Sequence, residues 1–120
     1  MWALTTAELA TGPTACLVVD GALHPLVELA AAHGVALPDT VAAVFADWAR
    51  CEPVLAKLAA GAADGRPASE ATLLAPLRYP GKILCAGANY YDHMAEMGFP
   101  GITKESQRLF FFMKPPRNAI

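Results

Sequence analysis

The sequence has little of what would mark a membrane, secreted or nucleic-acid-binding protein. Hydrophobic residues make up 55% of its 120 residues, yet no apolar run approaches the roughly 18 residues that a membrane-spanning helix needs. The N-terminus lacks the basic region and the long apolar core of a signal peptide. We therefore expect a cytoplasmic protein with no membrane partner.

Charge and cysteine are also sparse. The 9 basic and 11 acidic residues are scattered and give a net charge of −2, so no basic patch of the kind that binds phosphate backbones is visible, and we expect no nucleic-acid partner. Cys16, Cys51 and Cys85 are odd in number and far apart. This pattern fits neither a disulfide framework nor the short spacings of zinc sites, and it predicts reduced, mostly buried thiols.

The first part of the chain has the pattern of a small scaffold. An apolar run over 15–19 and a second run over 22–24 flank Asp20-Gly21, the dipeptide that best suits a two-residue hairpin turn. A helix is predicted to follow over 26–33, with Gly34 at its C-terminal end. The scaffold therefore begins with a β-hairpin and a short helix.

Two further helices are predicted after this start. Asp39 is placed to cap a helix over 40–50, and Pro53 is placed to start a second helix over 54–60. Apolar residues recur in the first of these at intervals of three and four, which predicts a buried stripe of Val41, Val44, Phe45 and Trp48. The turn formers of 61–67 then predict a linker, followed by an extended piece within 69–77.

The most informative stretch is an apolar strand followed by a polar helix. Residues 83–86 suit a buried strand, and Gly87 permits a turn that a β-carbon would hinder. Asn89 is placed to cap a helix over 90–97, which Gly98 would end. We therefore predict a strand, a turn and a short helix in direct succession.

His93 and Glu96 are three residues apart on this predicted helix and so share one face. A carboxylate beside an imidazole can act as a general-base pair. Two other interpretations remain open from the spacing alone: an ordinary surface contact, and a pair of metal ligands.

The rest of the chain predicts a mobile connector and a second strand. Residues 99–108 are polar and rich in turn formers, which is typical of a loop or lid. An apolar strand is predicted over 109–113, followed by Lys114, whose ammonium group could meet an anionic substrate or simply be solvated. Because the sequence stops soon after this strand, we expect a truncated chain.

Two motifs in this region resemble the start of the catalytic domain in the fumarylacetoacetate hydrolase family. They are Asn-Tyr-x-Asp-His-x-x-Glu, which begins at Asn89, and Phe-x-Lys-Pro, which begins at Phe112. The resemblance is strong over 77–120 and loose before that. We therefore expect an α+β chain, with an N-terminal module of hairpin and helices over 1–68 and, as the resemblance implies, the first strands of an incomplete mixed β-roll over 69–120.

The same resemblance implies a function. The parent protein would be a metal-dependent hydrolase, lyase or isomerase that acts on carbon–carbon bonds of 2-oxo or 1,3-dicarbonyl acids. His93 and Glu96 would activate water, while Lys114, Asn89 and Tyr90 would bind the substrate or border its pocket.

The resemblance further implies a homodimer and a magnesium, manganese or calcium ion bound by acidic residues, including a Glu-x-Glu pair. The sequence contains no Glu-x-Glu, so we assign no metal ligand here and expect the ligands beyond residue 120. The alternative is that this chain is a non-catalytic N-terminal module or fragment that mediates subunit contacts.

Overall fold

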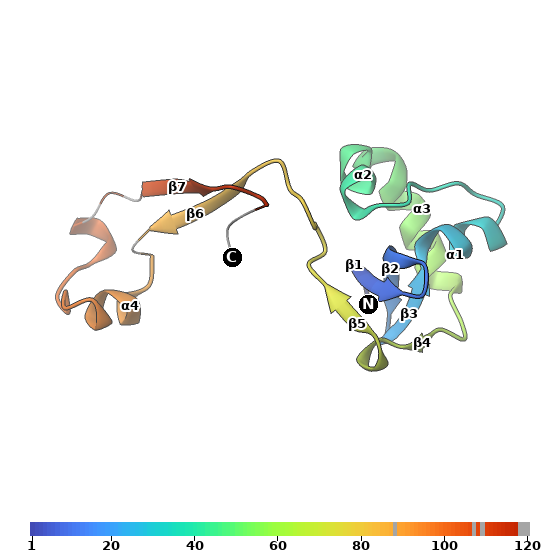
Figure 1. Cartoon of the computed structure of the whole chain (residues 1–120), viewed down its shortest axis with the longest axis horizontal. Helices are drawn as coiled ribbons and strands as arrows, with labels where there is room; N and C mark the ends of the chain where they lie inside the picture. The colour runs from blue at the N-terminus through green and yellow to red at the C-terminus, as the bar shows by residue number, and fades with distance from the viewer. Residues whose placement is uncertain (88, 107, 109, 118–120) are drawn as a thin grey trace. The chain divides into compact units, whose positions relative to one another are not determined.

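The computed structural model describes residues 1–87, 89–106, 108 and 110–117. The chain is α+β, as predicted, and divides into unit 1 (Met1–Arg78) and unit 2 (Tyr79–Ile120) (Figure 1). The boundary expected after Ala68 falls inside unit 1, because a strand after that residue pairs with the first strand of the chain. Within the described residues, no helix is both long and apolar enough to cross a membrane.

Unit 1 is built on an antiparallel five-stranded sheet with the strand order β4-β3-β2-β1-β5. The five strands, in chain order, are β1 (Trp2–Leu9), β2 (Gly12–Val19), β3 (Ala22–Pro25), β4 (Arg66–Pro67) and β5 (Thr72–Leu74). The predicted hairpin at Asp20-Gly21 is confirmed, since Val19 pairs with Ala22. Both turn residues have positive φ, 47° and 86°, as a type I′ turn requires.

β1 was not predicted, although it lies between β2 and β5 in the sheet. Its consecutive residues Thr5, Thr6 and Ala7 are all buried, which hides the alternation that identifies a half-exposed strand. The Thr6 hydroxyl donates a hydrogen bond of 2.9 Å to the carbonyl oxygen of Pro76, so its burial leaves no polar group unpaired.

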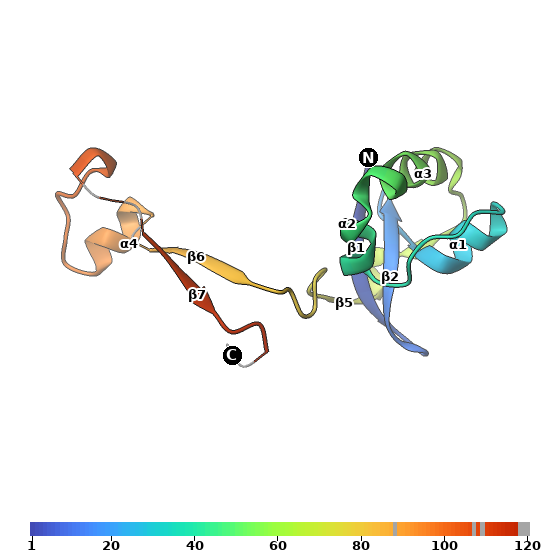
Figure 2. The same cartoon turned by 90° about the horizontal axis from the view of Figure 1, so that it is seen from above.

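Three helices cover one face of this sheet: α1 (Leu26–Ala32), α2 (Val41–Ala46) and α3 (Trp48–Gly61) (Figures 1 and 2). Side chains from β2 and all three helices form the main core, which contains Ala15, Leu17, Leu26, Ala30, Val41, Val44, Cys51, Leu55 and Leu58. A smaller cluster of Ala7, Cys16 and Leu23 lies on the opposite face of the sheet, because successive side chains of a strand point to opposite faces. Both faces of the central strands therefore carry buried residues.

The helix predicted over 40–50 is in fact two helices, because the chain breaks at Asp47, where φ is −126° and ψ is 46°. The second helix runs without interruption past Pro53, which was wrongly predicted to start a new one. Pro53 lacks one helical N–H group, but Cys51 and Leu55 on either side of it are fully buried. Burial of this helix therefore outweighs the local effect of the proline.

The predicted cap and half of the predicted stripe of the first helix were wrong. Thr40, not Asp39, is the N-cap, since its hydroxyl accepts a hydrogen bond of 3.2 Å from the Ala43 N–H. Phe45 and Trp48 are 49% and 39% exposed, and their rings stack with centroids 5.3 Å apart. The break at Asp47 places Trp48 in a different helix from the two buried valines.

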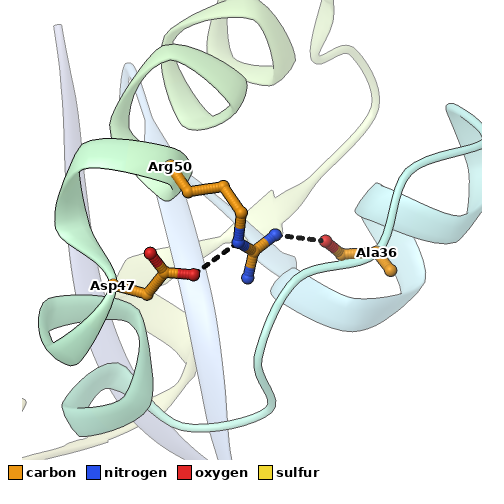
Figure 3. A network of polar contacts seen from close by, with 3 residues as sticks. All are labelled: Ala36, Asp47 and Arg50. Carbon is orange, nitrogen blue, oxygen red and sulfur yellow. Dashed lines mark hydrogen bonds and ion pairs between the residues drawn. The ribbon is translucent and has the colours of Figure 1, made fainter.

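The break at Asp47 is held by Arg50, which also reaches the segment before α2. The Arg50 Nε donates to the Asp47 carboxylate, and its NH1 group donates to the Ala36 carbonyl oxygen at 3.4 Å (Figure 3). The hydrogen bond to Asp47 raises the pKa of the Arg50 guanidinium above its ordinary value. This exposed network fixes the loop before α2 against the start of α3.

The predicted linker over 61–67 is irregular over 62–65, but both of its ends belong to regular elements. Gly61 ends α3, Arg66 and Pro67 form β4 against β3, and a 3-10 turn, η1 (Ala68–Glu70), follows. Gly65 passes so close to the imidazole of buried His24 that a β-carbon there would lie 2.6 Å from the ring. The segment is therefore packed against the sheet.

Unit 2 contains a two-stranded antiparallel ribbon of β6 (Ile83–Gly87) and β7 (Phe110–Lys114), with α4 (Tyr91–Glu96) and a 3-10 turn, η2 (Lys104–Ser106), between them. The predicted start of the second strand, Leu109, lies outside the described residues, as does Gln107 in the predicted lid. The part of that lid from Thr103 to Ser106 is a hydrogen-bonded turn.

The strand predicted over 83–86 is present, but the prediction that it is buried was wrong. Leu84 on β6 is 63% exposed, and the four apolar residues of β7 are 45% to 69% exposed, namely Phe110, Phe111, Phe112 and Met113. An isolated pair of strands cannot cover its own faces, because burial needs a second layer or further strands. The apolar sequence of this ribbon is therefore not matched by burial within the described residues.

The three cysteines are free, as predicted. Cys16 and Cys51 are fully buried and Cys85 is half-buried. Burial raises the pKa of the Cys16 thiol above its ordinary value, and this effect exceeds the opposite one of a backbone hydrogen bond at Ala7.

Candidate functional site

The candidate site lies on the strand, turn and helix that the sequence predicted. β6 ends at Gly87, and α4 begins at Tyr91 after the extended residue Tyr90, which occupies the N-cap position with no side-chain cap. Asn89 was predicted to be the cap, and this was wrong. The helix starts one residue later than expected, which leaves Asn89 one position too early for its side chain to accept from the first helical turn.

His93 and Glu96 meet on one face of α4, as their spacing predicted. His93 Nδ1 lies 3.6 Å from Glu96 Oε2. This separation is too long for a good hydrogen bond but short enough for an ion pair when the imidazole carries a proton. The two side chains are 58% and 79% exposed, so substrate and water could both reach them.

One side chain of α4, that of Met94, is buried, with 6% of its surface exposed. The Met94 carbonyl oxygen accepts a hydrogen bond of 2.9 Å from the Phe99 N–H. Gly98, with φ of 87°, lets the chain make this turn and confirms the predicted end of the helix. The covered side of α4 therefore carries Met94, while His93 and Glu96 lie on its exposed side.

The register of the ribbon places Lys114 away from this pair. Lys114 was expected after the strand, but it is the last residue of β7 and pairs with Ile83 at the start of β6. α4 follows Gly87, which pairs with Phe110 at the other end (Figure 1). Lys114 and Phe110 are therefore separated along β7 by about 13 Å, at roughly 3.3 Å per residue.

The other two predicted binding residues lie next to each other before α4. Tyr90 is 71% exposed and Asn89 is half-buried. Their positions leave Tyr90 accessible from solvent beside the helix that carries His93. Whether either residue binds a substrate stays a prediction.

Two contacts in unit 2 were not predicted from the sequence. The ring of Phe110 lies against Gly87, its partner across the ribbon. The guanidinium carbon of Arg117 lies 4.8 Å from the ring centroid of Tyr79, a cation–π geometry. Neither has a local signal in the sequence, because each depends on how the two strands pair.

The described residues contain no group of three His, Cys, Asp or Glu side chains that could hold a metal ion. His93 and Glu96 alone offer one nitrogen and one carboxylate, whereas a hard divalent cation binds six or more oxygen ligands, some of them from water. The donor set of the described residues therefore does not fit a magnesium, manganese or calcium ion. What the pair can do by itself is accept a proton and stabilise the resulting imidazolium.

Two curated proteins share a short segment with the chain. They are the human mitochondrial oxaloacetate tautomerases FAHD2B and FAHD2A, each 50% identical over 34 residues, which is 28% of this chain and 11% of each relative. The similarity therefore covers a small part of those enzymes. No protein-family profile matches the chain, and no solved structure does.

Proposed function

We propose that this chain is part or all of an enzyme of the fumarylacetoacetate hydrolase type, with His93 as its general base and Glu96 as the group that holds it. The observation that carries the proposal is the 3.6 Å contact between His93 Nδ1 and Glu96 Oε2 on an accessible face of α4. The segment shared with two oxaloacetate tautomerases supports chemistry of this class.

The substrate would be a 2-oxo or 1,3-dicarbonyl acid, whose hydrogen next to a carbonyl group is acidic. In a tautomerisation, the neutral His93 imidazole takes this proton from carbon. The electron pair of the broken C–H bond becomes the C=C bond of the enol, and the π pair of the C=O bond moves onto the oxygen. This oxygen takes a proton from water, and the imidazolium returns its proton to the resulting hydroxide. A positioned base contributes about 10²- to 10⁴-fold to such a step.

Glu96 would act through His93. Its carboxylate lies on the side of Nδ1, so it favours the imidazolium that forms when Nε2 takes the proton. If the reaction is instead a hydrolysis of a carbon–carbon bond, the same imidazole would take its proton from water. Lys114, Asn89 and Tyr90 are the proposed substrate-binding residues.

A magnesium, manganese or calcium ion, a homodimer and a cytoplasmic location belong to the proposal for the whole protein. The described residues do not supply a metal centre, and the step described above is the part that His93 and Glu96 would contribute. Calorimetric titration of the chain with magnesium should show no stoichiometric site. Stoichiometric binding at micromolar affinity would instead indicate a local metal site at His93 and Glu96.

One observation favours a second, non-catalytic function. His93 and Glu96 are 58% and 79% exposed, whereas catalysis is favoured by a site that excludes water. A module that mediates subunit contacts would leave them exposed in this way. Activity of the purified chain distinguishes the two functions.

The test follows the enol–keto interconversion of oxaloacetate by ultraviolet absorbance. His93→Ala and Glu96→Gln should each slow it strongly, whereas Asp92→Asn, which neutralises an adjacent exposed carboxylate on the same helix, should change it little. Because His93 and Glu96 act as one unit, the double variant should be about as slow as the worse single variant. An unchanged rate in His93→Ala would refute the general base.

A further inference from the structure

We propose that the substrate is an extended dicarbonyl acid with a second anionic group at its far end, and that this group binds at the end of the ribbon that lies away from α4. This substrate class rests on the function proposed above and adds to it a length and a charge. Its basis is the separation of His93 from Lys114, which a compact substrate could not bridge.

The ribbon separates Lys114 from the helix that carries His93. Lys114 pairs with Ile83 at one end of the ribbon. Phe110 pairs with Gly87 at the other end, about 13 Å away at roughly 3.3 Å per residue. α4 begins after Gly87, and Figures 1 and 2 both show it beyond that end. Side chains of a strand stand roughly perpendicular to the sheet, so the lysine side chain leaves most of this gap open. A compact acid such as oxaloacetate would therefore contact His93 without reaching Lys114.

The end of the ribbon that holds Lys114 is rich in cations. Lys82 directly precedes β6, and Arg117 follows Lys114 by three residues. The Arg117 guanidinium carbon lies 4.8 Å from the centroid of the Tyr79 ring, which keeps Arg117 near the start of β6. All three cationic residues are exposed. We call Lys82, Lys114 and Arg117 the cationic end of the ribbon.

Within the described part of unit 2, no carboxylate lies at this cationic end. The acidic residues of the unit, Asp92, Glu96 and Glu105, all belong to the segment between β6 and β7, which starts and finishes at the α4 end. Salt at physiological ionic strength screens exposed charges beyond about 8 Å, so acids that lie one ribbon length away do not neutralise the cationic end. Like charges without a counter-charge attract an ion of the opposite sign, here the anionic group at the far end of the substrate.

Two aromatic side chains lie between the two ends, on the face of the ribbon that carries Lys114. Successive side chains of a strand alternate between faces, so Phe110, Phe112 and Lys114 share one face. Phe110 and Phe112 are 55% and 45% exposed. An apolar chain that links the two acid groups of the substrate would cover these rings, and removal of apolar surface from water favours binding. The substrate therefore has a dicarbonyl acid at one end, an apolar middle and an anion at the other end.

Two matched series of substrates test this class with the whole chain. Each compound is a 2-oxo acid with a 1,3-dicarbonyl group and an alkyl chain, and the chain ends in a carboxylate in one series and in a methyl group in the other. Ultraviolet absorbance of the enol follows the reaction. The ratio of kcat/KM between the two series, at equal chain length, should be lowest for the shortest pair. It should rise by about tenfold once the carboxylate reaches the cationic end, as expected for hydrogen bonds between charged groups.

The gain should appear in KM. The cationic end lies away from the reacting carbon, so it binds the substrate and the transition state equally well, and such uniform binding lowers KM without raising kcat. Higher ionic strength should reduce the gain, because the contact is between exposed charges.

Variants assign the gain to the cationic end. Lys114→Gln should bring the ratio of the two series close to that of the shortest pair, whereas Lys114→Arg, which keeps the charge, should retain most of the gain. Lys82→Gln and Arg117→Gln should each reduce it in part. Arg108→Gln is the matched control, because Arg108 is an exposed cation that precedes β7 at the α4 end, and it should leave the ratio unchanged.

Two results would overturn the substrate class and leave the general base in place. One is a ratio that stays flat as the chain lengthens. The other is an equal fall of the ratio in Lys114→Gln and Arg108→Gln, which would indicate an effect of overall charge alone. A chain that acts on neither series and not on oxaloacetate would instead refute the proposed function, and with it this substrate class.

Discussion

The ring of Phe110 lies over Gly87, its partner across the ribbon, so closely that a β-carbon on Gly87 would overlap the aromatic ring. Gly87 thus serves two purposes, since it ends the strand before α4 and leaves room for a cross-strand aromatic side chain. Packing of an aromatic ring over a glycine compensates for the side chain that the glycine lacks.

Gly87→Ala should therefore destabilise the ribbon by about 1 kcal/mol, the lower end for an added methyl group, because the Phe110 ring that it would displace is 55% exposed and can move aside. Faster hydrogen exchange of the β6 and β7 amides would report the effect. Gly81→Ala is the matched control, because a β-carbon there meets nothing within 4 Å. Equal exchange in the two variants would show that Phe110 does not pack on Gly87.

Thr40→Ala should lower the free energy of unfolding of unit 1 by about 1 kcal/mol, the usual contribution of an N-cap side chain. Its hydroxyl accepts the Ala43 N–H at the start of α2. Asp39→Ala, at the position that the sequence favoured, should change the stability little. Urea unfolding of both variants decides between the two caps, and a larger loss in Asp39→Ala would contradict the structure.

Leu55→Ala should cost more stability than Phe45→Ala, although phenylalanine is the larger residue. Leu55 is fully buried, so its truncation leaves a cavity and should cost about 2–5 kcal/mol. Phe45 is 49% exposed and loses its stacking on Trp48, which is worth about 0.5–1.5 kcal/mol beyond the buried area. Thermal unfolding of the two variants would rank them, and the opposite order would mean that Phe45 belongs to the core.

The raised pKa of Cys16 predicts a loss of stability in alkali. The unfolded thiol loses its proton near the ordinary value of about 8.5, whereas the folded thiol holds it to higher pH. Above this value the folded state binds more protons than the unfolded state, so a rise in pH favours unfolding. Below it, the contribution of Cys16 is fully present, and it is lost as the pH rises through the folded pKa.

Denaturation of the unmodified chain and of Cys16→Ala across pH 7 to about 10.5 would isolate this effect from other groups that titrate there. The stability difference between the two proteins should shrink as the pH rises. A difference that stays constant would show that the thiol keeps its ordinary proton affinity in the folded state.

The parts of the fold that the sequence predicted are those fixed by local chemistry. Asp20-Gly21 forms its turn, and Gly34 and Gly98 end their helices with positive φ, because only a few residue types adopt these conformations readily. The contact between His93 and Glu96 was predictable for the same reason, since helical spacing alone brings them together.

The parts that could not be predicted depend on tertiary packing. Pro53 stays inside α3 because Cys51 and Leu55 are buried beside it, and no local rule contains that information. Thr5 and Thr6 form a central strand only because β2 and β5 pair with both of its edges. The separation of Lys114 from α4 follows from the register of two strands that are distant in sequence.

The position of β1 has a consequence for the order in which unit 1 can assemble. β1, β2 and β3 are consecutive and joined by short turns, so they can pair as soon as they have been synthesised, at little cost in chain entropy. The other edge of β1 stays unpaired until β5 (Thr72–Leu74) has been synthesised. Pairing of β5 with β1 then closes a loop that contains α1, α2 and α3. Contacts between distant residues form slowly, so docking of β5 should be the late step of folding, and chains halted before residue 72 would expose β1 to association with other nascent chains.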